Sequence, residues 1–248
     1  MSRRDEEAAG YREAADREAY LRGHSGLPGP RGNLELIDVA SAATDRATLE
    51  RWAALGPDAA PENTPEAFLA CVGTVGLGRI VAGGDRSPLP TLRRAANDSR
   101  WRVREAVAMA LQAWGDADVE GLVEEMDSWA AGSPLEGRAA TAALCEPRLL
   151  RAPSVVARTL HVLGRLTASV RDATDPAAMD VRTLRQALGY GWSVAIAADV
   201  GRGLPAFEPW LADPSPDVRW IVRENLAKRR FARVAPAWIE RARAQVAR

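Results

Sequence analysis

Arginine and tryptophan occur side by side at two places in this sequence, and these residues are well suited to bind a ligand. A guanidinium group can hold a phosphate or a carboxylate through two parallel hydrogen bonds. A neighbouring tryptophan can stack on a base or a cation. We therefore predict a binding surface composed of Arg100, Trp101, Arg102, Arg219, Trp220 and Arg223. The alternative is that both tryptophans fill grooves between packed helices.

A second candidate site is the segment 23–33, which is rich in glycine and proline. This composition predicts a non-helical segment. His24, Arg31 and Asn33 supply polar side chains there, so the segment could be a lid or a binding loop. The alternative is a plain linker that joins an N-terminal helix to the rest of the chain.

Metal and cofactor chemistry are disfavoured by the few residues that could support them. The chain has two histidines, His24 and His161, and neither has a cysteine or a carboxylate at metal-ligand spacing. Cys71 and Cys145 are far apart and flanked by small or apolar residues, which indicates neither a zinc site nor a disulfide framework. We expect no metal and no cofactor, and we assign no catalytic residue.

Composition and charge limit the class of protein. The chain has 248 residues, 47% of them apolar, which is enough to bury a sizeable core in one elongated domain or two small ones. Basic and acidic residues balance at 33 each, but nine basic and only four acidic residues follow residue 212. This basic C-terminal region could attract nucleic acid or an acidic protein. The alternative is a solvated face that keeps the last helices soluble. Lacking a signal-peptide pattern or a long uncharged run, the chain is expected to be cytoplasmic, without a membrane partner.

The elements that must position these residues are predicted to be helices. Apolar residues recur at three- and four-residue spacing, and Val103, Val107, Leu111 and Trp114 define one buried helix face. A capping residue followed by proline predicts helix starts at Thr64-Pro65, Ser87-Pro88, Ser133-Pro134, Asp175-Pro176 and Ser215-Pro216. Further helices are expected at Arg3–Arg22, Leu34–Ala43, Thr48–Leu55 and Pro65–Ala82.

The turn before Arg104 is repeated before Arg219, since each has an aspartate, a short turn and a Val-Arg pair that opens an amphipathic helix. Together with weaker copies between them, this pattern resembles HEAT repeats over roughly residues 89–233. The resemblance implies an all-α solenoid of antiparallel helical hairpins. It divides the chain into residues 1–33, an N-terminal helix with the Gly/Pro-rich segment, and a repeat domain over residues 34–248.

The same resemblance implies structural roles for the repeat's own residues. In HEAT repeats the arginine commonly pairs with the turn aspartate of its own or a neighbouring repeat. This predicts structural bridges by Asp98, Arg104 and Asp213, with Arg104 facing Asp98 and Arg219 facing Asp213. The alternative is that these arginines clamp a ligand.

The expected function is a binding scaffold, because stacked helical hairpins leave an extended curved surface. The most favoured partner is another protein, and reversing Arg102 and Arg223 to glutamate should abolish its capture without lowering the melting temperature. The alternative is a DNA-binding protein related to the HEAT-like alkylpurine DNA glycosylases, which excise damaged bases. Those enzymes also need a carboxylate near paired aromatics, and residues 55–96 of this chain do not supply that arrangement.

Overall fold

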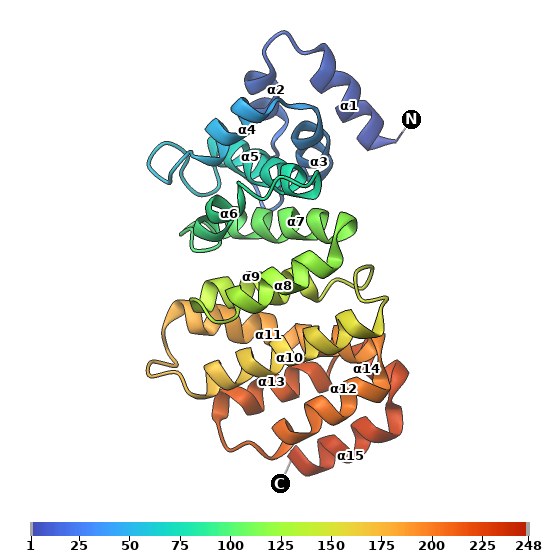
Figure 1. The fold of residues 1–248 in the computed structure, drawn as a ribbon. Coiled ribbons are helices and arrows are strands. Elements are labelled where there is room, and N and C mark those ends of the chain that lie inside the picture. Colours follow the sequence, from blue (N-terminus) through green and yellow to red (C-terminus); the bar gives the residue numbers. More distant parts are fainter. Residues whose placement is uncertain (1, 247–248) are drawn as a thin grey trace. The chain divides into compact units, whose positions relative to one another are not determined.

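The computed structural model describes residues 2–246, which form fifteen α-helices and one short 3-10 helix and contain no β-strand (Figure 1). The predicted all-α class is therefore confirmed. The chain divides into two compact units, Met1–Ala117 and Asp118–Arg248. The sequence-based boundary at residues 33 and 34 does not coincide with this division, because the N-terminal residues pack into the first unit.

The first unit is built around one long helix. Its helices are α1 (Arg3–Glu13), α2 (Arg17–His24), α3 (Leu34–Ala43), α4 (Arg46–Ala53), α5 (Pro65–Ala82), α6 (Leu89–Ala95) and α7 (Trp101–Ala117). Helix α5 contacts α2, α3, α4, α6 and α7. It begins at the predicted Thr64 cap and ends at Gly83. By length and composition α5 could cross a membrane, but 72% of it is buried inside the protein, so it serves as the unit's core helix.

Several side chains from residues 2–33 belong to the hydrophobic core of the first unit. Tyr11, Leu21 and Leu27 are buried in one cluster with Leu36 and Phe68. The predicted single helix over residues 3–22 is interrupted and forms α1 and α2. Residues 23 and 24, expected to be non-helical, complete the last turn of α2. The burial of these apolar side chains explains why the segment is ordered rather than a linker.

The second unit contains two rows of adjacent helices. Its elements are α8 (Val119–Trp129), α9 (Pro134–Leu144), α10 (Pro153–Arg171), α11 (Met179–Ala198), α12 (Val200–Phe207), η1 (Glu208–Ala212), α13 (Pro216–Leu226), α14 (Arg229–Val234) and α15 (Pro236–Val246). One row consists of α9, α11 and α13, and the other of α8, α10 and α12, with α10 packed on α11. Helix α15 packs on α13 at one end of the unit.

Local capping explains most of the predicted helix starts. The hydroxyl groups of three predicted caps accept a backbone N–H in the first turn: Thr64, Ser133 and Ser215. Helix α6 begins one residue after Pro88. The prediction at Asp175 is wrong, because its carboxylate accepts the N–H of Ala177 in a turn and α11 begins only at Met179.

Candidate functional site

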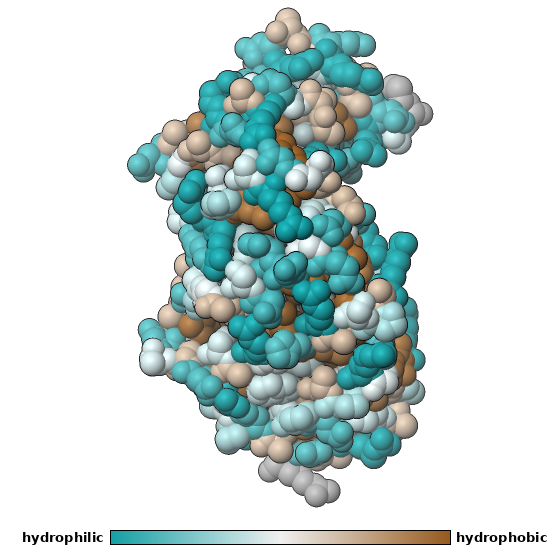
Figure 2. Space-filling model, viewed as in Figure 1, coloured by the Kyte–Doolittle hydropathy of each residue, from teal (hydrophilic) through white to brown (hydrophobic). Residues whose placement is uncertain are grey.

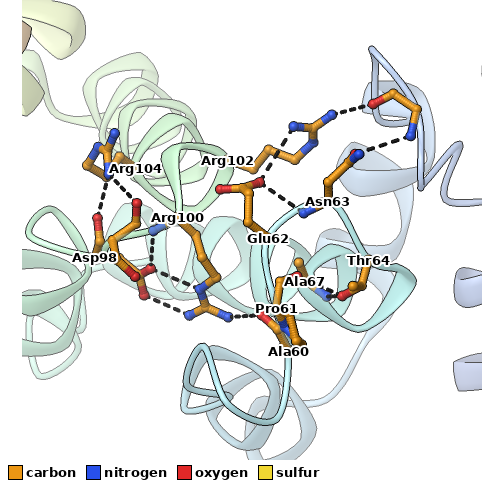
Figure 3. Close-up of polar contacts among 12 residues, drawn as sticks. Ala60, Pro61, Glu62, Asn63, Thr64, Ala67, Asp98, Arg100, Arg102 and Arg104 are labelled. Atoms are coloured by element: carbon orange, nitrogen blue, oxygen red, sulfur yellow. Dashed lines mark hydrogen bonds and ion pairs between the residues drawn. The ribbon is translucent and has the colours of Figure 1, made fainter.

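Arg100 lies inside the first unit, where it holds the turn before α7 (Figure 3). Its side chain is 3% exposed. The Nε and Nη2 atoms donate to the two carboxylate oxygens of Asp98 at 2.9 and 2.7 Å. Nη1 donates to the carbonyl of Ala60 at 2.9 Å, and Nη2 also donates to the carbonyl of Leu55 at 2.8 Å. The prediction that Arg100 lies on an open surface is wrong, because the 55–60 loop covers it and takes its donors.

Asp98 and Arg100 form an internal ion pair, and this pair lowers the pKa of Asp98. Burial by itself would raise the pKa of Asp98, but the hydrogen bonds from the Arg100 side chain and backbone outweigh it and lower that pKa. Arg104, which is buried, reaches the same turn and donates to the carbonyls of Asp98 and Ser99 at 2.6 and 2.9 Å. These contacts support the structural role that the sequence suggests for Asp98 and Arg104.

The Gly/Pro-rich segment covers Arg102 at the start of α7 (Figure 3). The Arg102 side chain is only 10% exposed, and its Nη2 donates to the carbonyl of Gly29 at 2.6 Å. Its Nη1 lies 3.6 Å from the carboxylate of Glu62. Its guanidinium stacks over the ring of Trp101, 4.3 Å from the centroid, and Trp101 is 48% exposed. Of the predicted triplet in this unit, Trp101 alone is largely open to solvent.

Two of the three polar residues predicted for the Gly/Pro-rich segment have structural contacts. The ring of His24 stacks on Tyr20 with centroids 3.9 Å apart. Asn33 is buried, caps α3, and donates to the carboxylate of Glu7 at 2.6 Å. Arg31 is exposed and makes no side-chain hydrogen bond or ion pair within residues 2–246. Arg31 is therefore the candidate of this segment that is best placed to meet a ligand.

The second predicted triplet, Arg219, Trp220 and Arg223, lies on α13, and its arginines are more exposed than Arg100 and Arg102. Arg219 and Arg223 are exposed, and their guanidinium groups make no hydrogen bond or ion pair in the described part of the chain. The predicted bridge between Asp213 and Arg219 is absent there. Asp213 instead accepts the N–H of Ser215 at 2.9 Å and lies 3.9 Å from Arg171. Asp213 therefore keeps a structural role, and Arg219 has no ionic partner among residues 2–246.

One part of the Trp220 side chain packs against α11. The Arg185 guanidinium lies over its ring, 4.8 Å from the centroid, and also pairs with Asp217. The other contact is with Gly189, where a Cβ atom would come within 2.8 Å of the ring. Trp220 is half-buried. These contacts favour the packing alternative for Trp220.

A cationic groove of about 540 Å³ lies between α13 and α15. We call it the α13–α15 groove, and it is lined by Arg219, Arg223, Leu226, Ala227, Arg243 and Val246. Arg243 donates through Nη2 to the carbonyl of Leu226 at 2.6 Å. Arg243 is not among the site residues predicted from the sequence. The basic excess after residue 212 was the available signal, but only the packing of α15 on α13 places this arginine beside the other two.

Neither the cysteines nor the potential metal ligands of the described residues form a reactive or metal-binding site. Cys71 and Cys145 are free thiols in the interior, and desolvation raises the pKa of each to about 12. Within residues 2–246, no three His, Cys, Asp or Glu side chains come together in a way that could hold a metal ion.

Exposed large apolar side chains are scattered over the described residues. They are Leu34, Trp101, Met179, Tyr190 and Val234. On the face shown in Figure 2, hydrophilic side chains predominate over each unit and hydrophobic ones appear only in patches.

The predicted surface is divided between the two units, with residues 100–102 in the first and residues 219–223 in the second. In the first unit internal contacts occupy both arginines, whereas in the second both arginines are open. No known protein family, curated protein or solved structure matches the chain.

Proposed function

We propose that this chain is a HEAT-like α-solenoid protein that acts in the cytoplasm as a scaffold for binding another protein. In this proposal successive helices are antiparallel hairpins, and the partner lies along their second helices. The adjacency of α9, α11 and α13, and of α8, α10 and α12, supports a repeated hairpin arrangement. An array of this kind exposes an extended surface on which a partner can lie.

The observation that carries the proposal is the state of Arg219 and Arg223. Some arginines of the second unit pair with a carboxylate: Arg185 pairs with Asp217, and Arg165 pairs with Asp127 at 2.6 Å. Arg219 and Arg223 lie one helical turn apart, and both are exposed and have no such partner in the described part of the chain. Two ordered helix positions that hold unpaired guanidinium groups are suited to capture a negatively charged partner.

The test is capture of a partner by the tagged full-length chain from an extract of its native cells. We expect the double variant Arg219→Glu/Arg223→Glu to lose a protein that the unaltered chain retains. The control is Arg182→Glu on α11, which reverses an exposed arginine that makes no side-chain hydrogen bond or ion pair in the described residues. Equal retention of every captured protein by the double variant would reject the surface.

DNA binding is the second candidate, because the same unpaired arginines could neutralise phosphates. Affinity for DNA would then fall steeply as salt rises, since phosphate contacts release counterions. Titrations with duplex and single-stranded DNA over a range of salt concentrations separate the two functions. Release of a base from alkylated DNA would support the glycosylase variant of this candidate.

A further inference from the structure

The α13–α15 groove combines three cations with an apolar lining. Arg219 and Arg223 line it from α13, and Arg243 lines it from α15. Leu226, Ala227 and Val246 supply the apolar part, and no acidic residue among residues 2–246 belongs to the lining. The groove thus offers positive charge on two helices around a small hydrophobic surface.

Arg243 is oriented so that it reduces the negative potential at the C-terminal end of α13, beside the groove. Its Nη2 atom donates to the carbonyl of Leu226, near the C-terminal end of α13. Carbonyl groups at a helix C-terminus carry partial negative charge, which would repel an anion. Arg243 offsets that charge and keeps further N–H donors for a ligand, since a guanidinium group has five.

From these features we propose that the α13–α15 groove binds an acidic segment of a partner protein that also carries an apolar side chain. This inference rests on the proposed scaffold function and names the chemistry of the partner. Carboxylates of the segment pair with Arg219, Arg223 and Arg243. An apolar side chain of the segment packs against Ala227 and Val246.

The lining favours a peptide over a nucleic acid. Binding of single-stranded nucleic acid generally uses aromatic side chains on which bases stack. Among the residues that the structure describes, the groove lining contains none. Trp220, the aromatic residue of α13, instead lies between Arg185 and Gly189 on α11. Bidentate arginine–carboxylate pairs beside an apolar contact suit a peptide with alternating glutamate and leucine.

The experiment measures fluorescence anisotropy of a labelled short peptide of alternating glutamate and leucine with the full-length chain. We expect saturable binding that weakens with salt, and much weaker binding of the matching glutamine–leucine peptide. Arg223→Glu and Arg243→Glu should each weaken binding of the acidic peptide at least about tenfold, because each places a repulsive charge in the groove.

Two controls separate groove binding from general charge attraction. Arg241→Glu reverses an exposed arginine on α15 that does not line the groove, and Arg182→Glu does the same on α11. Both should bind the acidic peptide like the unaltered chain. Thermal unfolding followed by circular dichroism checks that Arg243→Glu, which loses the contact to Leu226, still folds, and Arg223→Glu tests the groove without that loss.

Several results would overturn the proposal. They are no binding of the acidic peptide, equal loss in the control variants, or tighter groove-dependent binding of oligo-dT than of the peptide. Capture of a cellular protein tests the scaffold function separately from the groove. If the chain captures a cellular protein equally well with and without Arg223→Glu and Arg243→Glu, the scaffold stands and the groove assignment is wrong.

Discussion

Gly189 on α11 lies directly against the indole ring of Trp220 on α13. A Cβ atom at position 189 would come within 2.8 Å of that ring and 3.2 Å of the Cβ of Glu224. The absence of a side chain at this position therefore sets how closely α11 and α13 approach.

Replacing Gly189 by alanine should lower the free energy of unfolding, whereas the same replacement at an uncrowded glycine should not. The added methyl group overpacks the contact with Trp220, at a cost of about 1–3 kcal/mol. The matched control is Gly164→Ala in α10, where a Cβ would meet nothing within 4 Å. That control should stabilise by about 0.5–1 kcal/mol through helix propensity. Urea unfolding measures both, and equal effects of the two changes would contradict the packing of Trp220 on Gly189.

Asn225 joins α13 to α11 through a fully buried amide. Its Nδ2 donates to the carbonyls of Leu188 and Ile221 at 2.9 and 2.8 Å, and its Oδ1 accepts the N–H of Ser193 at 2.8 Å. Asn225→Asp removes both donors and points a carboxylate at two carbonyls. We expect a loss of at least about 3 kcal/mol at neutral pH, since an unpaired buried charge costs more than an unpaired neutral group.

Comparison with Asn225→Ala identifies the cause of that loss. The alanine variant leaves the three backbone groups without the amide but adds no charge, so it should be less destabilised than the aspartate variant. Chemical denaturation of both variants at neutral pH gives the order. An aspartate variant as stable as the unaltered chain would show that this amide is not buried.

Removing Arg100 should be strongly destabilising at neutral pH, because it leaves Asp98 and two loop carbonyls without their buried cation. We expect Arg100→Ala to lose about 3–5 kcal/mol. The matched control is Arg158→Ala, which breaks an exposed ion pair with Glu120 and should change stability little. Unfolding free energies from urea titrations test both.

The effect of Arg100→Ala should shrink in acid. The folded-state pKa of Asp98 is lowered, so the pair contributes stability above the ordinary aspartate pKa of about 3.9, and this contribution is lost as pH falls through the lower folded value. The difference in stability between the unaltered chain and Arg100→Ala is therefore largest at neutral pH. A difference that grew in acid would contradict the role of the Asp98 carboxylate.

Arg102→Glu should lower the melting temperature and loosen the Gly/Pro-rich segment. The new carboxylate would face Glu62 and the carbonyl of Gly29, so we expect a loss of about 1–3 kcal/mol. Hydrogen exchange of residues 26–32 should accelerate. Arg31→Glu in the same segment is the control, because Arg31 is exposed and makes no such contact in the described residues. Unchanged exchange in Arg102→Glu would reject the contact with Gly29.

This expectation replaces one drawn from the sequence, that reversing Arg102 leaves the melting temperature unchanged. The sequence places Arg102 beside Trp101 at a helix start but gives no information on what packs there. The contact with Gly29 joins residues 73 positions apart. Such a contact depends on where the chain returns in space, which no local pattern specifies.

Helices and many of their ends follow from local sequence. The predicted ranges Leu34–Ala43 and Pro65–Ala82 agree with α3 and α5, because apolar periodicity, a capping side chain and a terminal proline or glycine act within one or two turns. Asp175-Pro176 carries the same local signal but begins a turn. A capping pattern therefore predicts a helix start only when the following residues also pack as a helix.

The sequence by itself determined that this chain is helical and which arginines stand near tryptophans, because those properties depend on neighbouring residues. Only the tertiary structure decided which of these arginines can meet a partner. Arg100 is enclosed by a loop from residues 55–60, while Arg219 and Arg223 remain exposed beside Arg243. The difference arises because a guanidinium group becomes unavailable when distant carbonyls and carboxylates fold around it, and their positions are set by packing of the whole unit.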